Sequence, residues 1–131
     1  MRPRVLYISG HPEDARDLMR MLAGLPMALH YAKSLRQARQ KIQQHHYAVV
    51  LTESSLPDGT WLDVLRLANQ AASELQVIVT DPQADARFWA EALNLGAYDL
   101  LTQPFYQPEV RRILSNACSH APVQETSMAA V

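Results

Sequence analysis

Short apolar runs, each ended by polar residues, recur about every 25 residues and limit what this chain can fold into. The clearest runs are Val5–Ile8, Ala48–Leu51 and Gln76–Thr80. Their length and their β-branched residues are typical of strands that are buried on both faces of a sheet. Residues 27–32, which are less apolar and expected nearer an edge, and residues 98–101 complete five predicted strands.

Amphipathic segments separate these strands, with apolar residues three or four positions apart, and predict five helices. The expected helices run from Pro12 to just before Gly24, from Ser34 to residue 44, from Gly59 to residue 72, from Asp81-Pro82 to Leu95, and from Pro108 to residue 118. Alternating strands and helices predict an α/β fold whose parallel sheet is covered on both faces and joined by right-handed crossovers. For five strands the expected fold is the flavodoxin-like (βα)5 three-layer sandwich, with strand order 2-1-3-4-5.

The bulk properties exclude several classes of protein. A length of 131 residues predicts one domain, which we place at 1–118, with 119–131 as a flexible tail or the start of a linker. A net charge of −1 provides no field for nucleic acid or an anionic membrane. No apolar run approaches the ~20 residues of a membrane helix. The single cysteine, Cys118, cannot form an internal disulfide, so we expect a cytoplasmic protein.

Polar residues follow four of the predicted strands, at the edge where open parallel sheets bind ligands. These residues are Ser9-Gly10-His11, Glu53, Thr80-Asp81 and Gln103-Pro104. Glu53 follows the central apolar run, and an acidic side chain at that place is the first candidate for function.

Four segments carry a resemblance to a known family: VLYISGHPED, AVVLTESSLPDG, VIVTD and GAYDLLTQPF. Over about residues 4–118 the chain resembles the receiver domain of bacterial two-component response regulators, of which the chemotaxis receiver is one. The last segment is the most specific, since it is similar to the family pattern Gly-Ala-x-Asp-Tyr-Leu-x-Lys-Pro-Phe. The resemblance implies a signalling function and a cis peptide bond before Pro104.

The resemblance fails at the residues that perform the family's chemistry. A working receiver holds Mg²⁺ with two adjacent carboxylates and the phospho-accepting aspartate, and it also uses a lysine, a hydroxyl and a switch aromatic. The carboxylate pair aligns with Ser9 and Gly10, the phospho-acceptor with Glu53, the lysine with Gln103 and the aromatic with Leu100, so that only the hydroxyl, Thr80, is kept. Mg²⁺ needs several oxygen ligands, and electrostatic stabilisation supplies most of phosphoryl-transfer catalysis. We therefore expect a degenerate receiver, or pseudo-receiver, with no catalytic residue, no Mg²⁺ and no other cofactor.

Three interpretations of Glu53 follow from this. The side chain is a solvated carboxylate at a strand end, a mimic of the phosphorylated aspartate that reaches toward Thr80, or an unusual phospho-acceptor. We favour the solvated interpretation, because the neutralising lysine and the switch aromatic are missing. His11, with Glu13 and Glu53 nearby, suggests a transition-metal site, but zinc sites usually have three or four protein ligands. We therefore expect His11 to be a surface loop residue and predict no metal site.

Four aromatic residues, Phe88, Trp89, Phe105 and Tyr106, are candidates for an interface, since aromatic residues are enriched at binding hot spots. Phe88 and Trp89 are adjacent on one helix, so both cannot face the core. In receivers the surface formed by the fourth helix, fifth strand and fifth helix is the usual partner and dimer face. The implied partners are a kinase, an output domain, another regulator or a second copy of the chain, with no membrane and no direct nucleic acid.

The sequence thus predicts a phosphorylation-independent protein–protein interaction module of two-component-type signal transduction. The alternative is a receiver that is still phosphorylated weakly, or by non-standard chemistry, as part of a phosphorelay. An enzyme on a flavodoxin-like fold is disfavoured, because no glycine-rich loop follows the first strand and no nucleophile–base pair is visible.

Overall fold

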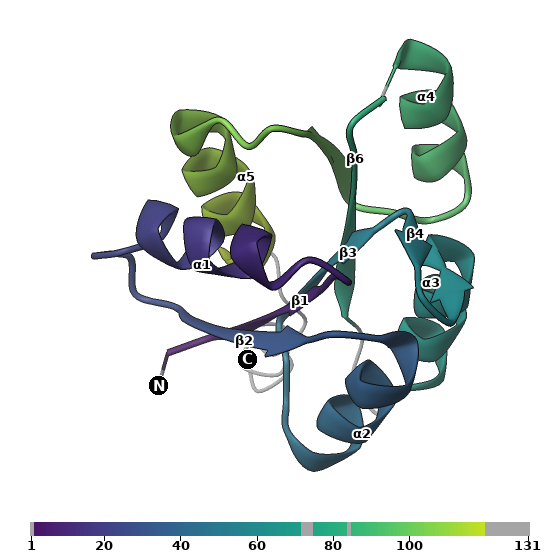
Figure 1. The fold of residues 1–131 in the computed structure, drawn as a ribbon, viewed down its shortest axis with the longest axis horizontal. Coiled ribbons are helices and arrows are strands. Elements are labelled where there is room, and N and C mark those ends of the chain that lie inside the picture. Colours follow the sequence, from purple (N-terminus) through teal and green to yellow (C-terminus); the bar gives the residue numbers. More distant parts are fainter. Residues whose placement is uncertain (1, 72–74, 84, 120–131) are drawn as a thin grey trace, which may run out of the picture.

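Five parallel strands form the central sheet of the computed structural model, which describes residues 2–71, 75–83 and 85–119 (Figure 1). The sheet strands are β1 (Arg4–Ile8), β2 (Ala28–Ala32), β3 (Val49–Glu53), β6 (Gln76–Asp81) and β7 (Asp99–Thr102). Their order is β2-β1-β3-β6-β7, which confirms the predicted flavodoxin-like arrangement. β3 therefore lies at the centre of the sheet, with β1 on one side and β6 on the other.

Five helices cover the two faces of this sheet. They are α1 (Pro12–Met21), α2 (Leu35–Gln44), α3 (Trp61–Gln70), α4 (Ala86–Asn94) and α5 (Gln107–Ser119). In Figure 1, α1 and α5 lie together on one side of the sheet, and α2, α3 and α4 lie on the other. The described part of the chain is thus a three-layer sandwich.

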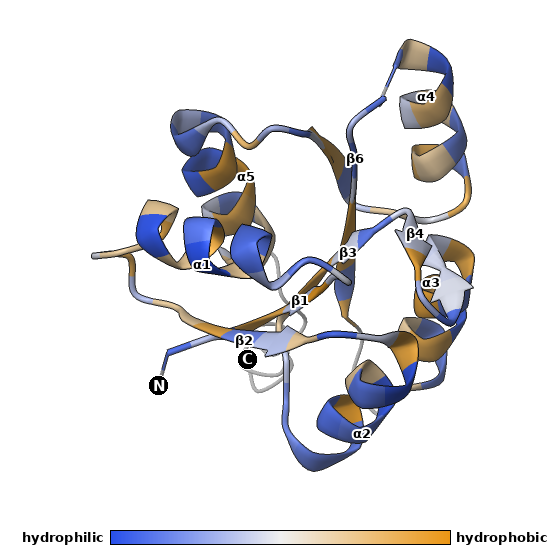
Figure 2. Cartoon of the chain, viewed as in Figure 1, coloured by the Kyte–Doolittle hydropathy of each residue, from blue (hydrophilic) through white to orange (hydrophobic). Residues whose placement is uncertain are grey.

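The alternation of side chains along the strands divides the core in two. Val5 and Tyr7 of β1 pack toward α1 and α5, whereas Leu6 and Ile8 pack toward α2 and α3. All five residues of β3 are buried, as expected for a central strand covered on both faces. Figure 2 shows the consequence, with hydrophobic colour along the central strands and hydrophilic colour on the outward sides of α1 and α2.

Several predicted helix boundaries are confirmed by the backbone. The Ser34 side chain accepts a hydrogen bond from the Gln37 N–H and caps α2. Gly24 and Gly96 follow α1 and α4 with φ of 87° and 111°, a left-handed conformation that favours glycine. Gly96 directly follows the C-cap of α4, as expected, whereas α1 ends earlier than predicted and Gly24 lies two residues after its C-cap, Leu22.

Other boundaries differ from the prediction. α4 does not begin at Asp81-Pro82, because β6 extends to Asp81 and the helix starts after Asp85, whose side chain accepts a hydrogen bond from the Phe88 N–H. The turn around Pro57 is flanked by a small antiparallel pair, β4 (Ser55–Leu56) and β5 (Gly59–Thr60). Ser119 is the last residue of α5, and the remainder of the predicted tail, 120–131, lies outside the described residues.

Asp58 ties the loop after β3 to the first turn of α2. Its two carboxylate oxygens accept hydrogen bonds from the Leu35 N–H at 2.8 Å and the Arg36 N–H at 3.0 Å. Burial opposes ionisation of Asp58, but these N–H groups outweigh that effect and lower its pKa. The carboxylate therefore acts as a second cap of α2, supplied by a distant loop.

We expect Asp58→Ala to lower the free energy of unfolding by about 1 kcal/mol at neutral pH, the typical cost of losing a helix cap. Because the folded pKa of Asp58 is lowered, its contribution is present above the unfolded pKa and is lost as the pH falls through the folded value. Urea unfolding of both proteins at neutral and acidic pH measures the difference. Asp17→Ala, which removes an α1 carboxylate that is about half exposed and pairs with Arg20, is the control. An equal loss in both variants contradicts the capping role.

Candidate functional site

A cleft of about 550 Å³ opens at the carboxyl ends of β1, β3, β6 and β7. It brings together residues from all four polar segments that the sequence predicted there. The lining residues are His11, Glu13, Asp14, Glu53, Ser54, Ser55, Thr80, Asp81, Pro82, Gln103 and Pro104. None of these described lining residues is a lysine or an arginine, so the cleft combines four acidic side chains with a single imidazole.

Glu53 is buried rather than solvated, which corrects our expectation for this residue. Only 6% of its surface is exposed. The Nδ1 atom of His11 lies 3.2 Å from Oε1 and 3.1 Å from Oε2 of Glu53. The Tyr7 hydroxyl donates a hydrogen bond of 3.4 Å to Oε2. A buried carboxylate needs such partners, and here they come from β1 and the loop after it.

The register of the sheet explains why Glu53 meets Tyr7. Tyr7 is paired with Leu51 across β1 and β3, and Glu53 lies two residues further along β3, so the three side chains share one face. Tyr7 is fully buried, and its ring lies 6.2 Å from the Tyr31 ring and 6.1 Å from the Phe105 ring. Burial raises the pKa of Tyr7. The sequence analysis did not identify Tyr7 as a site residue, although the period of two along β1 and β3 was the signal that relates it to Glu53.

His11 and Asp14 enter the cleft from the start of α1. The His11 side chain is 63% exposed, as expected for a surface loop residue, and its ring also pairs with Glu53, a contact that the sequence did not reveal. The Oδ2 atom of Asp14 accepts a hydrogen bond of 3.4 Å from Nε2 of Gln103. Burial, followed by the negative charge of Glu53, raises the pKa of Asp14. Asp14 was missed as a site residue; its position three residues after His11, one helical turn away, was the available signal.

On the other side of Glu53, Thr80 has an unused hydrogen-bonding group. Thr80 is paired in register with Glu53 and fully buried, and its hydroxyl has no hydrogen-bond partner in the described part of the chain. Glu53 thus points its oxygens to His11 and Tyr7 and does not bond Thr80. Ser54 donates a hydrogen bond to Asp81 at the rim. Leu100 is buried, and the Gln103–Pro104 peptide bond is cis, the isomer implied by the resemblance.

The residues at the carboxylate-pair positions do not fit a Mg²⁺ site of the receiver type. Ser9 is fully buried, and its hydroxyl accepts a hydrogen bond of 2.9 Å from the His11 N–H. Gly10 offers no side chain, and a Cβ at that position would lie 3.3 Å from Cγ of Pro57. Mg²⁺ prefers octahedral oxygen ligands, usually including carboxylates. Here the pair positions supply no carboxylate at all.

The ion pair with Glu53 should be visible in the titration of His11. The hydrogen bond and negative charge of Glu53, with Asp14 and Glu13 adding smaller effects, raise the pKa of His11. Burial and nearby positive charges, with His45 foremost among them, lower the pKa of His30. We therefore expect His11 to lose its proton at a higher pH than His30. The stabilisation from the His11 pair is fully present below the unfolded pKa and is lost as the pH rises through the folded pKa.

NMR titration of the histidine ring signals in chelator-treated protein measures both values. In Glu53→Gln the pKa of His11 should fall toward the ordinary value of about 6.5, while His30 stays unchanged. A pKa of His11 that does not respond to this substitution would contradict the pairing.

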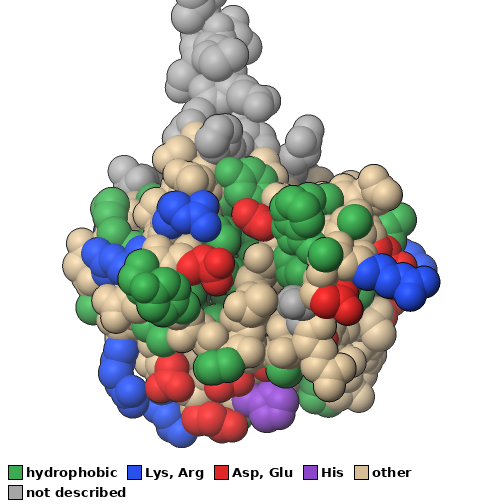
Figure 3. Space-filling model, turned by 90° about the horizontal axis from the view of Figure 1, so that it is seen from above, with side chains coloured by type: hydrophobic (Ala, Val, Ile, Leu, Met, Phe, Trp, Pro, Cys, Tyr) green, Lys and Arg blue, Asp and Glu red, His purple; other side chains and the backbone are tan. Residues whose placement is uncertain are grey.

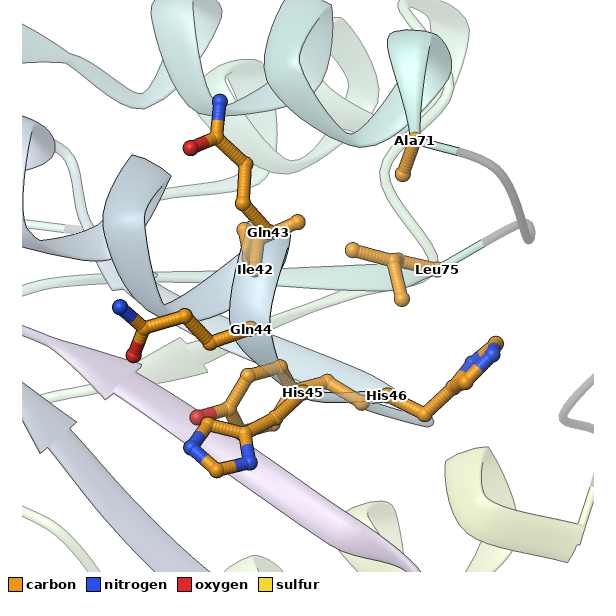
Figure 4. A pocket seen from close by; sticks show the side chains of 8 residues that line it. Ile42, Gln43, Gln44, His45, His46, Ala71 and Leu75 are labelled. Atoms are coloured by element: carbon orange, nitrogen blue, oxygen red, sulfur yellow. The ribbon is translucent and has the colours of Figure 1, made fainter.

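A second, smaller pocket of about 200 Å³ lies at the opposite, amino end of the strands (Figure 4). Its lining residues are Ile42, Gln43, Gln44, His45, His46, Tyr47, Ala71 and Leu75. Near it, the Tyr47 hydroxyl lies 2.8 Å from Nδ1 of His30, and the His30 and His45 rings are 5.5 Å apart. None of the described lining residues of this pocket is acidic, and it holds no predicted site residue.

The four predicted interface aromatics divide into two pairs. Phe88 is half-buried with its ring 5.8 Å from that of Trp61, and Phe105 is half-buried against Tyr7, so both contribute to the packing. Trp89 is 48% exposed and Tyr106 is 66% exposed, and the Trp89 indole N–H donates a hydrogen bond of 3.3 Å to Asp99. Figure 3 shows one face of the molecule, on which apolar side chains lie among acidic ones and beside a histidine.

Within the described ranges, no helix has the length and apolar character needed to cross a bilayer.

Comparisons with known proteins agree with this geometry. Residues 5–115 match the family described as the response regulator receiver domain. The chain is 26% identical over 117 residues to the response regulator protein PilR of Pseudomonas aeruginosa, covering 88% of this chain and 26% of that protein. It is 30% identical over 88 residues to the transcriptional regulatory protein DpiA of Escherichia coli K12, covering 67% of this chain and 38% of that protein. The chain thus spans well under half the length of these two curated relatives.

Solved structures show the same fold. The signal receiver domain of a LuxO repressor protein from Vibrio parahaemolyticus has a TM-score of 0.88 at 21% identity, over 97% of this chain and 98% of that one. The signal receiver domain of an HD domain-containing protein from Pseudomonas fluorescens Pf-5 has a TM-score of 0.81 at 27% identity, over 92% and 97%. The beryllofluoride-activated receiver domain dimer of NtrC4 has a TM-score of 0.80 at 23% identity, over 88% and 96%.

Proposed function

Because the chain belongs to the response regulator receiver domain family, we propose that it is a receiver that works as a protein–protein interaction module without being phosphorylated. Receivers are signalling modules, and this one keeps the family fold. At the carboxyl end of its sheet, a fixed arrangement of side chains replaces the aspartyl-phosphate cycle.

The arrangement around Glu53 carries this proposal. A phospho-acceptor must present a free oxygen to the phosphodonor, but both oxygens of Glu53 face the His11 imidazole and one also accepts a hydrogen bond from Tyr7. The group that would offset charge on a phosphoryl in transit is also missing, because Gln103 stands at the lysine position and bonds Asp14. In this account the Mg²⁺ site of the family is lost and the His11 ring supplies the positive charge beside Glu53.

Glu53 is not placed to imitate the phosphorylated aspartate in this conformation. Such a mimic would act on the switch hydroxyl, but the Thr80 hydroxyl donates no hydrogen bond to the Glu53 carboxylate. The switch aromatic is replaced by the buried Leu100. We therefore propose that Glu53 holds the cleft in one state, through β1 and α1, and does not drive a change at β6 and β7.

The alternative, a receiver phosphorylated weakly or by other chemistry, has one observation in its favour. At the position where the family bonds the phosphoryl group, the hydroxyl of Thr80 is buried and has no hydrogen-bond partner among the residues that the structure describes. Intact mass after treatment with a phosphodonor separates the two proposals, because only the alternative yields a phosphoryl adduct.

For the interaction surface we propose α4, β7 and α5, around Trp89 and Tyr106. The dimer described for the NtrC4 receiver domain makes a second copy of this chain one candidate partner, alongside a kinase, an output domain or another regulator. Trp89 fits an anchor role because its ring is half exposed while its indole N–H is held by Asp99.

We expect Trp89→Ala to weaken self-association by at least about tenfold, which corresponds to the ~1.4 kcal/mol of a moderate hot spot. Sedimentation equilibrium over a range of concentrations measures the association constant. The constant should be the same with and without acetyl phosphate and Mg²⁺. Leu62→Ala, on the exposed side of α3, is the control and should leave association unchanged. Association that strengthens with the phosphodonor would rule out phosphorylation independence, and an unaltered constant in Trp89→Ala would rule out this surface.

A further inference from the structure

We propose that His11, Asp14 and Glu53 form a binding site for a divalent transition-metal ion of the Zn²⁺ type. This inference goes beyond the proposed signalling function and does not depend on it. The ligand set differs from that of a receiver's Mg²⁺ site, because two of the three groups come from the loop before α1 and from α1 itself. From the sequence we considered His11, Glu13 and Glu53 as possible ligands and predicted no metal site. In the structure the third group beside His11 and Glu53 is Asp14.

The three ligand groups are already close together. One nitrogen of His11 and one oxygen each of Asp14 and Glu53 all lie within 4.8 Å of one another. Nδ1 of His11 is 3.1 Å from Oε2 of Glu53. Two ligand atoms that share a tetrahedral Zn²⁺ at about 2.0–2.1 Å are separated by roughly 3.3–3.4 Å. Shifts of the order of an ångström in the Asp14 side chain, which is only half-buried on the first turn of α1, would complete the set.

Both carboxylates are oriented by neutral hydrogen-bond donors, as ligating groups in metal sites usually are. The Tyr7 hydroxyl donates to Glu53, and the Gln103 side-chain amide donates to Asp14, each at 3.4 Å. Neither donor carries a charge that would compete with a cation. These bonds set the cluster apart from a chance gathering of surface acids.

The surroundings favour a cation and leave a place for its water. Glu13 and Asp81 also line the cleft, and no lysine or arginine is among its described lining residues. The hydroxyl of Thr80, fully buried and without a partner in the described part of the chain, lines the same cleft. Zinc sites with three protein ligands bind a water at the fourth position. Such a water would give the Thr80 hydroxyl the hydrogen-bond partner that it lacks among the described residues.

The chemistry of the donors selects the class of metal. An imidazole nitrogen suits Zn²⁺ and other late first-row ions, whereas Mg²⁺ and Ca²⁺ prefer oxygen ligands in greater number. With Ser9 and Gly10 at the pair positions, the two adjacent carboxylates of a receiver's Mg²⁺ site are absent. One neutral imidazole and two carboxylates give three ligands whose combined charge of −2 offsets the charge of Zn²⁺.

Isothermal titration of the chelator-treated chain with Zn²⁺, and separately with Mg²⁺, tests this proposal. We expect one Zn²⁺ site and an affinity for Mg²⁺ at least a hundredfold weaker. His11→Gln and Asp14→Asn should each weaken Zn²⁺ binding by at least about tenfold, the lower end of what even outer-sphere substitutions cost. Asp17→Asn is the matched control, because Asp17 is on the same helix, does not line the cleft and pairs with Arg20.

NMR of the histidine rings identifies where the ion binds. The His11 ring signals should shift first as Zn²⁺ is added, before those of His45 and His46 at the other end of the sheet. The proposal is overturned by an absence of Zn²⁺ binding, by affinity that is unchanged in both His11→Gln and Asp14→Asn, or by shifts that begin at His45 and His46. None of these results would bear on whether the chain is phosphorylated, so the two proposals fail separately.

Discussion

Replacing Tyr7 by phenylalanine should lower the free energy of unfolding by about 1–2 kcal/mol, although it removes only one oxygen atom. The Tyr7 hydroxyl donates to a carboxylate that is 6% exposed, and water cannot readily replace it. Leaving a buried charged acceptor without a donor costs roughly 1–3 kcal/mol. We place the effect in the lower part of that range because the bond is 3.4 Å long and His11 remains as a second partner.

The same substitution should cost much less when Glu53 is already methionine. Glu53→Met keeps the length of the side chain and removes the buried charge. In that background Tyr7→Phe no longer leaves a buried carboxylate without its hydrogen-bond donor. Replacing both members of a buried polar pair by apolar groups of similar shape is often nearly neutral. The double variant should therefore be about as stable as the parent chain, with a coupling energy on the order of 1 kcal/mol between the two positions.

Urea unfolding of the parent, the two single variants and the double variant gives this coupling energy directly. Tyr106→Phe is the matched control, since the Tyr106 side chain is 66% exposed, and it should change stability by less than about 0.5 kcal/mol. Additive effects of the two substitutions would mean that Tyr7 does not stabilise the Glu53 carboxylate.

The architecture followed from the sequence because packing, rather than site chemistry, determines it. The β-branched runs at β1, β3 and β6 are apolar enough to be buried on both faces, and the helical patterns between them require a parallel sheet with crossovers. The start of α4 was harder to predict. Pro82 suggested a helix start, whereas the side chain of Asp85 makes the capping bond, and only the structure distinguishes two such nearby signals.

The positions of the site residues were also predictable, but their contacts were not. The four loops of the cleft were identified from the ends of the strands, and Glu53 was correctly placed at their centre. Its burial was not foreseen, because the sequence does not show that the His11 ring turns back over β3 and that the Tyr7 hydroxyl reaches the carboxylate. Both contacts join residues more than 40 positions apart. The period of two along a strand indicates the face on which a side chain lies, but it does not show which side-chain atoms meet.

Together these contacts show how this chain accommodates an acidic side chain at the end of β3. The family balances the negative charge at the end of β3 with a metal ion and a lysine. In this chain a single imidazole from the loop after β1 pairs with the carboxylate, and Gln103 turns to Asp14. The buried charge of Glu53 is thereby compensated by residues that belong to the first βα unit.

Intact-mass spectrometry after incubation with acetyl phosphate and Mg²⁺ tests this account most directly. Parent chain and Glu53→Gln are treated side by side, with a receiver that retains all of its phosphorylation residues as the positive control for the donor. We predict that the mass of the parent chain stays unchanged while the positive control gains one phosphoryl group. The His11 and Tyr7 contacts occupy Glu53, and none of the described lining residues of the cleft is a lysine. A phosphoryl adduct that forms on the parent chain and is absent from Glu53→Gln would contradict the account.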